Sequence, residues 1–219
     1  MPSWTIHLAL ANKLNKKMNL CDDFLLGNIL PDVLDGYIIK KPSHFVNKNE
    51  SHFKNECTKE IDIDLFISKY KNKFNNPIVL GYLSHLVADK YFNDYFHSNH
   101  TIKKNNKIRT VLKNGSLDSS ENKPWQIKQR DFERFGQMLL NNNGLSDLTI
   151  CNINIKNFVI DEVVVDNNDL HQVRKTVKKM LNNKNIYNPN NYEVFTENEL
   201  NLIFNNCYKE ILAKLKAHI

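Results

Sequence analysis

Residues 81–93 read Gly81-Tyr-Leu-Ser-His-Leu-Val-Ala-Asp-Lys-Tyr-Phe-Asn93 and place a histidine and an aspartate inside an otherwise apolar, helix-like segment. His85 and Asp89 are four residues apart, so on a helix their side chains project from the same face. Because Tyr82 and Leu86 share that face, we expect the pair to point into the protein interior. A buried imidazole beside a buried carboxylate needs a partner, and a divalent metal ion satisfies both groups at once.

The remainder of the chain predicts a mostly α protein: a single-domain helical bundle over residues 1–219. Apolar residues recur at spacings of three and four in several stretches, which is typical of amphipathic helices. The expected helices cover residues 3–18, 22–31, 62–70, a segment opened by Pro77 that includes residues 81–93, then 126–140, 167–182 and 196–217. Residues 33–57 and 98–123 are expected to form loops. Residues 148–165 alternate in polarity, which predicts a short extended segment near 150–165 or a long connector.

Composition limits the class of protein. Apolar residues make up 41% of the 219 residues and charged residues 25%, as in ordinary globular proteins. The sequence contains no apolar run long enough for a membrane span and begins without the features of a secretory signal, so we expect a cytoplasmic protein. The formal charge of +6 comes from scattered lysines, which we interpret as solvated surface and not as a nucleic-acid patch.

Further ligand-type residues precede the His85–Asp89 pair. His7 lies on the first expected helix, Asp32 follows Pro31 at the end of the second, and His44 lies in the loop after it. Taken singly, these residues read as a core histidine, a turn residue and a loop histidine. Zinc favours imidazole nitrogen and carboxylate oxygen, so the joint pattern predicts a metal site. The predicted ligands are His7, Asp32, His44, His85 and Asp89. His52 and Glu56, in a highly charged stretch, are interpreted as a surface pair.

Four segments in this order resemble the zinc-dependent phospholipase C family, which is related to fungal single-strand nucleases with a three-zinc cluster. They are Trp4-Thr-Ile-His7, Leu26-Gly-Asn-Ile-Leu-Pro-Asp32, Ser43-His44-Phe45 and Gly81-Tyr-Leu-Ser-His-Leu-Val-Ala-Asp89. The chain is most similar to the intracellular, uncharacterised members of the family from low-GC bacteria, which also share a later segment like Asp131-Phe132. The resemblance covers roughly residues 3–140 and implies the same helical fold.

The resemblance also implies a distribution of ligands. Asp32, His44, His85 and Asp89 would hold one zinc ion, and Asp89 would bridge to a second ion that His7 also binds. Asp32 and Asp89 are therefore the predicted catalytic residues. In the secreted phospholipases an N-terminal tryptophan completes the second site, whereas Trp4 lies inside this sequence. The third site of the family needs a His-x-x-x-Glu pair, which does not occur after Asp89. The nearby substitutes are Asp94, His97, His100, Asp131 and Glu133.

These expectations favour a metal-dependent hydrolase of phosphodiesters that acts through a metal-activated water. The cofactor would be one to three zinc ions, with manganese or iron able to occupy the same ligands. The substrate would be a small-molecule or lipid phosphodiester, such as a phospholipid headgroup ester or a nucleotide. Two alternatives stay open: a catalytically inactive binding or scaffold protein that retains one zinc site, and a metal-free helical protein in which His85 and Asp89 pair with each other.

Overall fold

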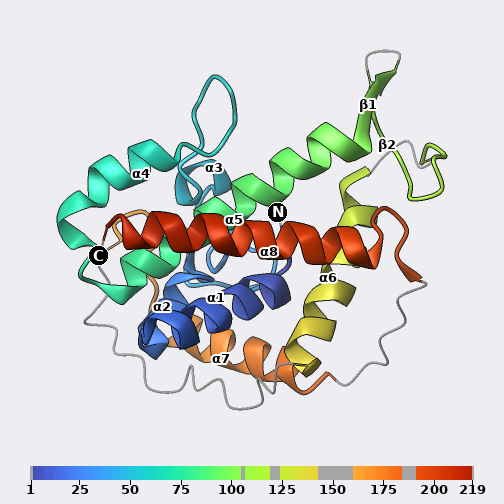
Figure 1. Cartoon of the computed structure of the whole chain (residues 1–219). Coiled ribbons are helices and arrows are strands. Elements are labelled where there is room, and N and C mark those ends of the chain that lie inside the picture. Colours follow the sequence, from blue (N-terminus) through green and yellow to red (C-terminus); the bar gives the residue numbers. More distant parts are fainter. Residues whose placement is uncertain (1, 105–106, 119–123, 143–159, 184–190, 219) are drawn as a thin grey trace.

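The computed structural model describes residues 2–104, 107–118, 124–142, 160–183 and 191–218, and most of these residues are helical (Figure 1). The α-helices are α1 (Trp4–Met18), α2 (Asp22–Gly27), α3 (Lys48–Ser51), α4 (Ile63–Tyr70), α5 (Pro77–His100), α6 (Pro124–Asn142), α7 (Asn167–Leu181) and α8 (Glu197–Lys216). Two 3₁₀ turns, η1 (Leu30–Asp32) and η2 (Lys71–Lys73), follow α2 and α4. The expected mostly α fold class is confirmed.

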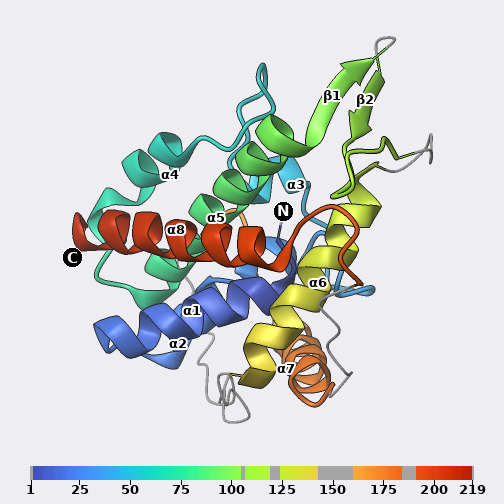
Figure 2. The ribbon, with the colours of Figure 1, turned by 45° about the vertical axis from the view of Figure 1, so that its right-hand side comes forward.

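Helix α5 lies at the centre of the molecule (Figures 1 and 2). Helices α1 and α2 pack against one side of it, and α4 and α8 pack against its other sides. The start of α5 is set locally, because Asn76 Oδ1 accepts a hydrogen bond from the Ile78 amide at 2.8 Å and Pro77 occupies the first turn. Every residue from Ile78 to Asp89 is buried. A helix that is apolar on all sides is typical of such a central position.

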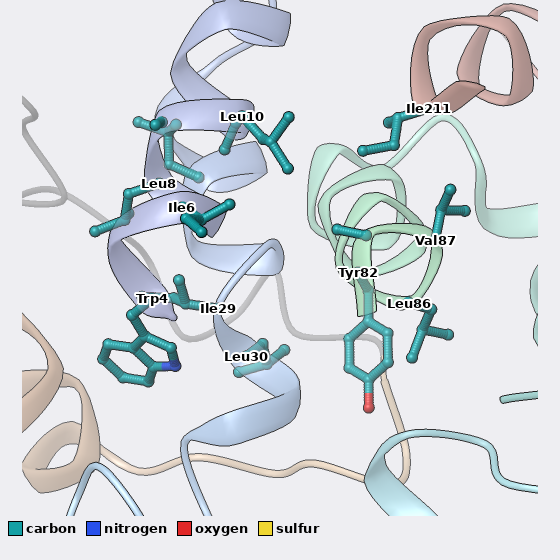
Figure 3. Close-up of a cluster of buried hydrophobic side chains, with 14 of the residues drawn as sticks. Trp4, Ile6, Leu8, Leu10, Ile29, Leu30, Tyr82, Leu86, Val87 and Ile211 are labelled. Carbon is teal, nitrogen blue, oxygen red and sulfur yellow. The ribbon is translucent and has the colours of Figure 1, made fainter. Parts of the chain in front are cut away.

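Figure 3 shows how the neighbouring helices fill the space around α5. Apolar side chains of α1 and of the α2–η1 segment lie on one side, Tyr82 and Leu86 of α5 lie at the centre, and Ile211 of α8 approaches from another direction. All of these side chains belong to one continuous buried cluster. The described helices therefore share a single hydrophobic core.

Helices α2 and α5 cross with their backbones in contact. A Cβ atom added to Gly81 would lie 2.2 Å from the carbonyl oxygen of Phe24, and one added to Gly27 would lie 2.2 Å from that of Ile78. Two glycines that face each other across the crossing permit this approach, which any larger side chain would prevent. As a result, the turn after α2 lies directly against the buried face of α5.

Residues 98–104 and 107–110 differ from the expected loop. Helix α5 continues to His100 and leads into strand β1 (Thr101–Lys104), which pairs antiparallel with β2 (Lys107–Thr110). This hairpin projects from the body of the molecule (Figure 1), so its strands carry mostly polar residues and lack an apolar face that a sequence pattern would reveal.

The extended segment expected near 150–165 falls largely outside the described residues, and residues 160–165 form no strand. In the part of the chain that is described, no helix is both long and apolar enough to cross a bilayer.

Candidate metal centre

Three imidazoles and two carboxylates from four elements meet in the core. His7 comes from α1, Asp32 ends η1, His52 follows α3, and His85 and Asp89 lie one turn apart on α5. All five side chains are buried. Such a concentration of titratable groups away from water is costly unless each has a partner.

Two overlapping groups within this cluster have the spacing of metal ligands. His7, Asp32 and His85 each offer one ligand atom, and these atoms all lie within 4.8 Å of one another; His52, His85 and Asp89 do the same. The two oxygens of Asp89 face different histidines, with Oδ1 3.2 Å from His7 Nε2 and Oδ2 3.4 Å from His52 Nε2. The cluster can therefore hold a metal ion, and its donor set of imidazoles and carboxylates suits zinc.

The turn after α2 fixes the orientation of the His85 ring. His85 Nδ1 lies 2.7 Å from the carbonyl oxygen of Asn28, which can only accept, so Nδ1 carries the proton. In the neutral ring Nε2 then has a free lone pair, and this atom faces His52 Nε2 at 3.3 Å. A histidine that donates its other nitrogen to a backbone carbonyl is the common second-layer arrangement around bound metals.

Two buried polar atoms of the cluster have no hydrogen bond to the described residues. Within the described part of the chain, His7 Nδ1 and Asp89 Oδ2 have no hydrogen-bond partner although both are buried. The His7 and His85 rings stack in parallel with centroids 4.0 Å apart, which disfavours a positive charge on both. The two buried carboxylates carry two negative charges, and Lys48 lies beside only one of them, Asp32. A bound divalent cation would offset this charge and satisfy the lone pairs.

The electrostatics of the cluster keep His85, Asp32 and Asp89 in the protonation states in which they can bind a metal ion. Burial, together with the neighbouring His7, lowers the pKa of His85 to about 3, so its imidazole is neutral at physiological pH. Burial alone would raise the pKa of Asp32, but Lys48, His52 and His85 hold it well below its usual range. The pKa of Asp89 is also lowered, because His85 and His7 outweigh the effect of burial.

Two donors bind Asp32 from the side of the cluster that faces solvent. The Trp4 indole Nε1 donates to Oδ2 at 3.2 Å, and Lys48 Nζ donates to Oδ1 at 3.3 Å and to Asp35 at 3.2 Å. Trp4 lies in the first turn of α1 and contacts the site through its ring. These bonds fix Asp32 at the boundary between the buried cluster and the surface.

A large cleft of about 2020 Å³ opens over this boundary. Asp32, Trp4 and Lys48 form part of its lining, which connects the cleft to the cluster. Basic residues outnumber acidic ones along its walls. The basic lining residues are Lys48, Lys54, Lys59, Lys90, Lys128, Arg130, Arg134 and Lys179, and the acidic ones are Asp32, Glu60, Asp94 and Glu133. The positive walls are suited to an anionic ligand.

The structure brings together four of the five predicted ligands: His7, Asp32, His85 and Asp89. The prediction for His44 requires correction. Its side chain is exposed, and its Nδ1 lies 3.1 Å from the hydroxyl of Ser43, which is itself bound to Asp169. His44 belongs to neither group of potential ligands among the described residues.

His52 takes the place expected for His44, so its interpretation as a surface residue was wrong. The buried Ser51 precedes it, and the Tyr82 hydroxyl of α5 donates to the Ser51 carbonyl oxygen. Phe53 follows it and packs edge-on against Phe66. The sequence contained a signal for this residue: residues 51–53 repeat the Ser-His-Phe of residues 43–45, and the charged neighbours obscured it.

The residues considered for a third metal have other roles in the structure. Asp131 is buried, but its carboxylate accepts hydrogen bonds from the backbone amides that precede α8, at Glu193, Val194 and Phe195. His100 Nε2 lies 2.6 Å from Glu199 Oε1. The others lie on the cleft: Asp94 pairs with Lys90, and His97 and Glu133 are exposed. None of them joins a potential metal group within the described residues.

No family model, no curated protein and no solved structure matches this chain.

Proposed function

We propose that this protein is a metal-dependent hydrolase of phosphodiesters, similar to the zinc-dependent phospholipases C. The observation that carries the proposal is the buried cluster of His7, Asp32, His52, His85 and Asp89 beside a cleft with basic walls. The cluster offers two groups of potential ligands that have His85 in common, and the two oxygens of Asp89 face His7 and His52. The cleft offers positive charge where a phosphodiester would approach them.

In this proposal each protein group has a defined task. Bound divalent ions would lower the pKa of a coordinated water and neutralise the phosphoryl group. Asn28 holds the proton of His85 on Nδ1 and so presents Nε2 as a ligand. Trp4 and Lys48 hold Asp32 in place at the edge of the cleft. The cleft residues attract the anionic substrate and orient it against the centre.

The test combines metal analysis with hydrolysis of bis(p-nitrophenyl) phosphate by protein loaded with zinc, manganese or iron. We expect bound metal and turnover in the wild type, and a loss of at least about 100-fold in the Asp89→Asn variant, because loss of a ligand should exceed the effect of an outer partner. Circular dichroism checks that the variant folds. Undiminished hydrolysis by a His85→Ala, Asp89→Ala double variant would contradict the proposal.

One observation favours a second candidate, a metal-stabilised protein without catalysis. Lys48 places an ammonium group 3.3 Å from Asp32, so a lysine already supplies part of the positive charge that a second ion would bring. This candidate predicts one tightly held metal ion per chain, unfolding on chelation, and no turnover with any of the three metals. Counting metal ions per chain in the same samples separates the two candidates.

A further inference from the structure

Lys128 of α6 is a buried cation in the wall of the cleft. Its Nζ donates to Asn93 Oδ1 at 3.1 Å and lies 4.1 Å from the centroid of the Phe96 ring. Both partners belong to α5, so the ammonium group is held between α6 and the central helix. An ammonium group can donate three hydrogen bonds, and Asn93 accepts only one of them.

Several other cations of the cleft have acidic partners, whereas Lys128 has none among the described residues. Lys48 pairs with Asp32, Lys90 with Asp94, and Arg130 with Glu193. Within the described ranges, no carboxylate lies at ion-pair distance from Lys128 Nζ. Burial lowers the pKa of Lys128 to about 8, which still leaves the side chain mostly charged at neutral pH. A buried charge without a counter-ion is unfavourable, and a bound anion would offset this cost.

The position of Lys128 connects it to the candidate metal centre. Its partner Asn93 follows Asp89 by four residues on α5, so the two side chains share a helix face. Four residues advance a helix by about 6 Å. Lys128 therefore lies about one helical turn beyond Asp89, a member of one of the two groups of potential metal ligands, on the side of the cleft.

We propose that Lys128 and Asn93 form an anion-binding subsite, which holds a second negatively charged group of the substrate while the phosphodiester lies at the metal centre. The group would be a phosphate or a carboxylate, because either presents oxygens to the ammonium. This assignment of the substrate rests on the proposed hydrolase function, but binding of an oxyanion at Lys128 does not. If both proposals hold, the substrate is a phosphodiester that carries a second anionic group close to its phosphodiester linkage.

The first experiment measures sulfate binding by isothermal titration calorimetry, since sulfate is an oxyanion with little affinity for zinc. The Lys128→Met variant removes the charge and keeps an unbranched side chain. Arg130→Met is the matched control, because Arg130 lines the same cleft but is exposed and paired with Glu193. We expect sulfate to bind at least about tenfold more weakly to Lys128→Met and within about twofold of the wild type to Arg130→Met.

Thermal unfolding of both variants shows whether they are folded, and Asn93→Ala provides a second test if Lys128→Met is not. The Asn93→Ala variant keeps the cation but removes the hydrogen-bond acceptor that holds it in place. Sulfate should therefore bind a few-fold more weakly to this variant than to the wild type. Equal sulfate affinities in the wild type, Lys128→Met and Asn93→Ala would overturn the subsite.

The second experiment compares three aryl phosphodiesters with the same p-nitrophenyl leaving group. One has no further charge, one carries a carboxylate, and one carries a phosphomonoester. For Lys128→Met we expect KM to rise about tenfold for the two substrates that carry a further anionic group and to stay unchanged for the one without it, with kcat preserved in all cases. An equal change in KM for all three would overturn the subsite. Absence of all turnover in the wild type, with sulfate binding still dependent on Lys128, would instead overturn the hydrolase proposal and leave the anion site intact.

Discussion

The same tripeptide, Ser-His-Phe, occurs twice in the connection between η1 and α4, at residues 43–45 and 51–53. The two copies differ in burial. His44 lies on the surface, whereas His52 lies inside the candidate metal centre. The phenylalanines differ in the same way: Phe45 is 70% exposed and Phe53 is 6% exposed. Identical local sequences therefore do not decide which histidine becomes a potential ligand.

The aromatic partner explains the difference. The Phe53 ring packs edge-on against Phe66 of α4 and Tyr82 of α5, with centroids 5.1 and 6.1 Å away. Phe53 adopts a left-handed φ of 50°, which costs a residue with a side chain about 1–2 kcal/mol. Burial of its ring offsets this cost, and the sharp turn directs His52 toward Asp32 and Asp89. The burial of one phenylalanine thus positions the neighbouring histidine.

The largest expected difference between the two tripeptides concerns their phenylalanines. Phe53→Ala should lower the free energy of unfolding by about 3–5 kcal/mol, because it leaves a cavity between α4 and α5. Phe45→Ala should change it by less than about 0.5 kcal/mol, since the ring is exposed. Urea unfolding monitored by circular dichroism measures both. Similar losses of unfolding free energy in the two variants would contradict the explanation that burial of the Phe53 ring positions His52.

The histidines provide the next comparison. His52→Ala should reduce metal affinity by at least about 100-fold, because it removes a buried nitrogen that faces two carboxylates. His44→Ala should retain the metal content of the wild type. Metal per chain after dialysis against a weak chelator distinguishes them. Metal loss in His44→Ala with retention in His52→Ala would reinstate His44 as the ligand.

The serines should give the smallest difference. Ser51 Oγ lies 2.9 Å from His52 Nδ1 and orients the ring, so Ser51→Ala should weaken metal binding by about tenfold. Ser43 Oγ lies 3.1 Å from the Nδ1 of the exposed His44 and also donates to Asp169 Oδ2 at 2.5 Å. Ser43→Ala should leave metal affinity unchanged and lower the free energy of unfolding by about 1 kcal/mol. Competition with a chromogenic chelator measures the metal affinities. A greater loss of metal affinity in Ser43→Ala than in Ser51→Ala would contradict this prediction.

Much of the helical structure could be predicted from the sequence. The helices expected at 3–18, 62–70 and 167–182 are observed at Trp4–Met18, Ile63–Tyr70 and Asn167–Leu181. These segments have an apolar stripe at helical spacing or a capping residue at their start, and both are local properties. The strands β1 (Thr101–Lys104) and β2 (Lys107–Thr110) were not predicted because they are stabilised by backbone pairing and carry few apolar residues.

Local sequence was enough to predict the central helix and the placement of His85 and Asp89 on one of its faces, because helical spacing and apolar context depend only on near neighbours. It also identified His7 and Asp32 as candidate ligands. Long-range packing places His52 and not His44 in the candidate metal centre, and it brings Asp131 within hydrogen-bond distance of the backbone amides before α8. It also buries Lys128 without a carboxylate partner among the described residues. Those outcomes depend on which side chains meet across helices distant in sequence, and on the burial of aromatic rings that a local pattern does not encode.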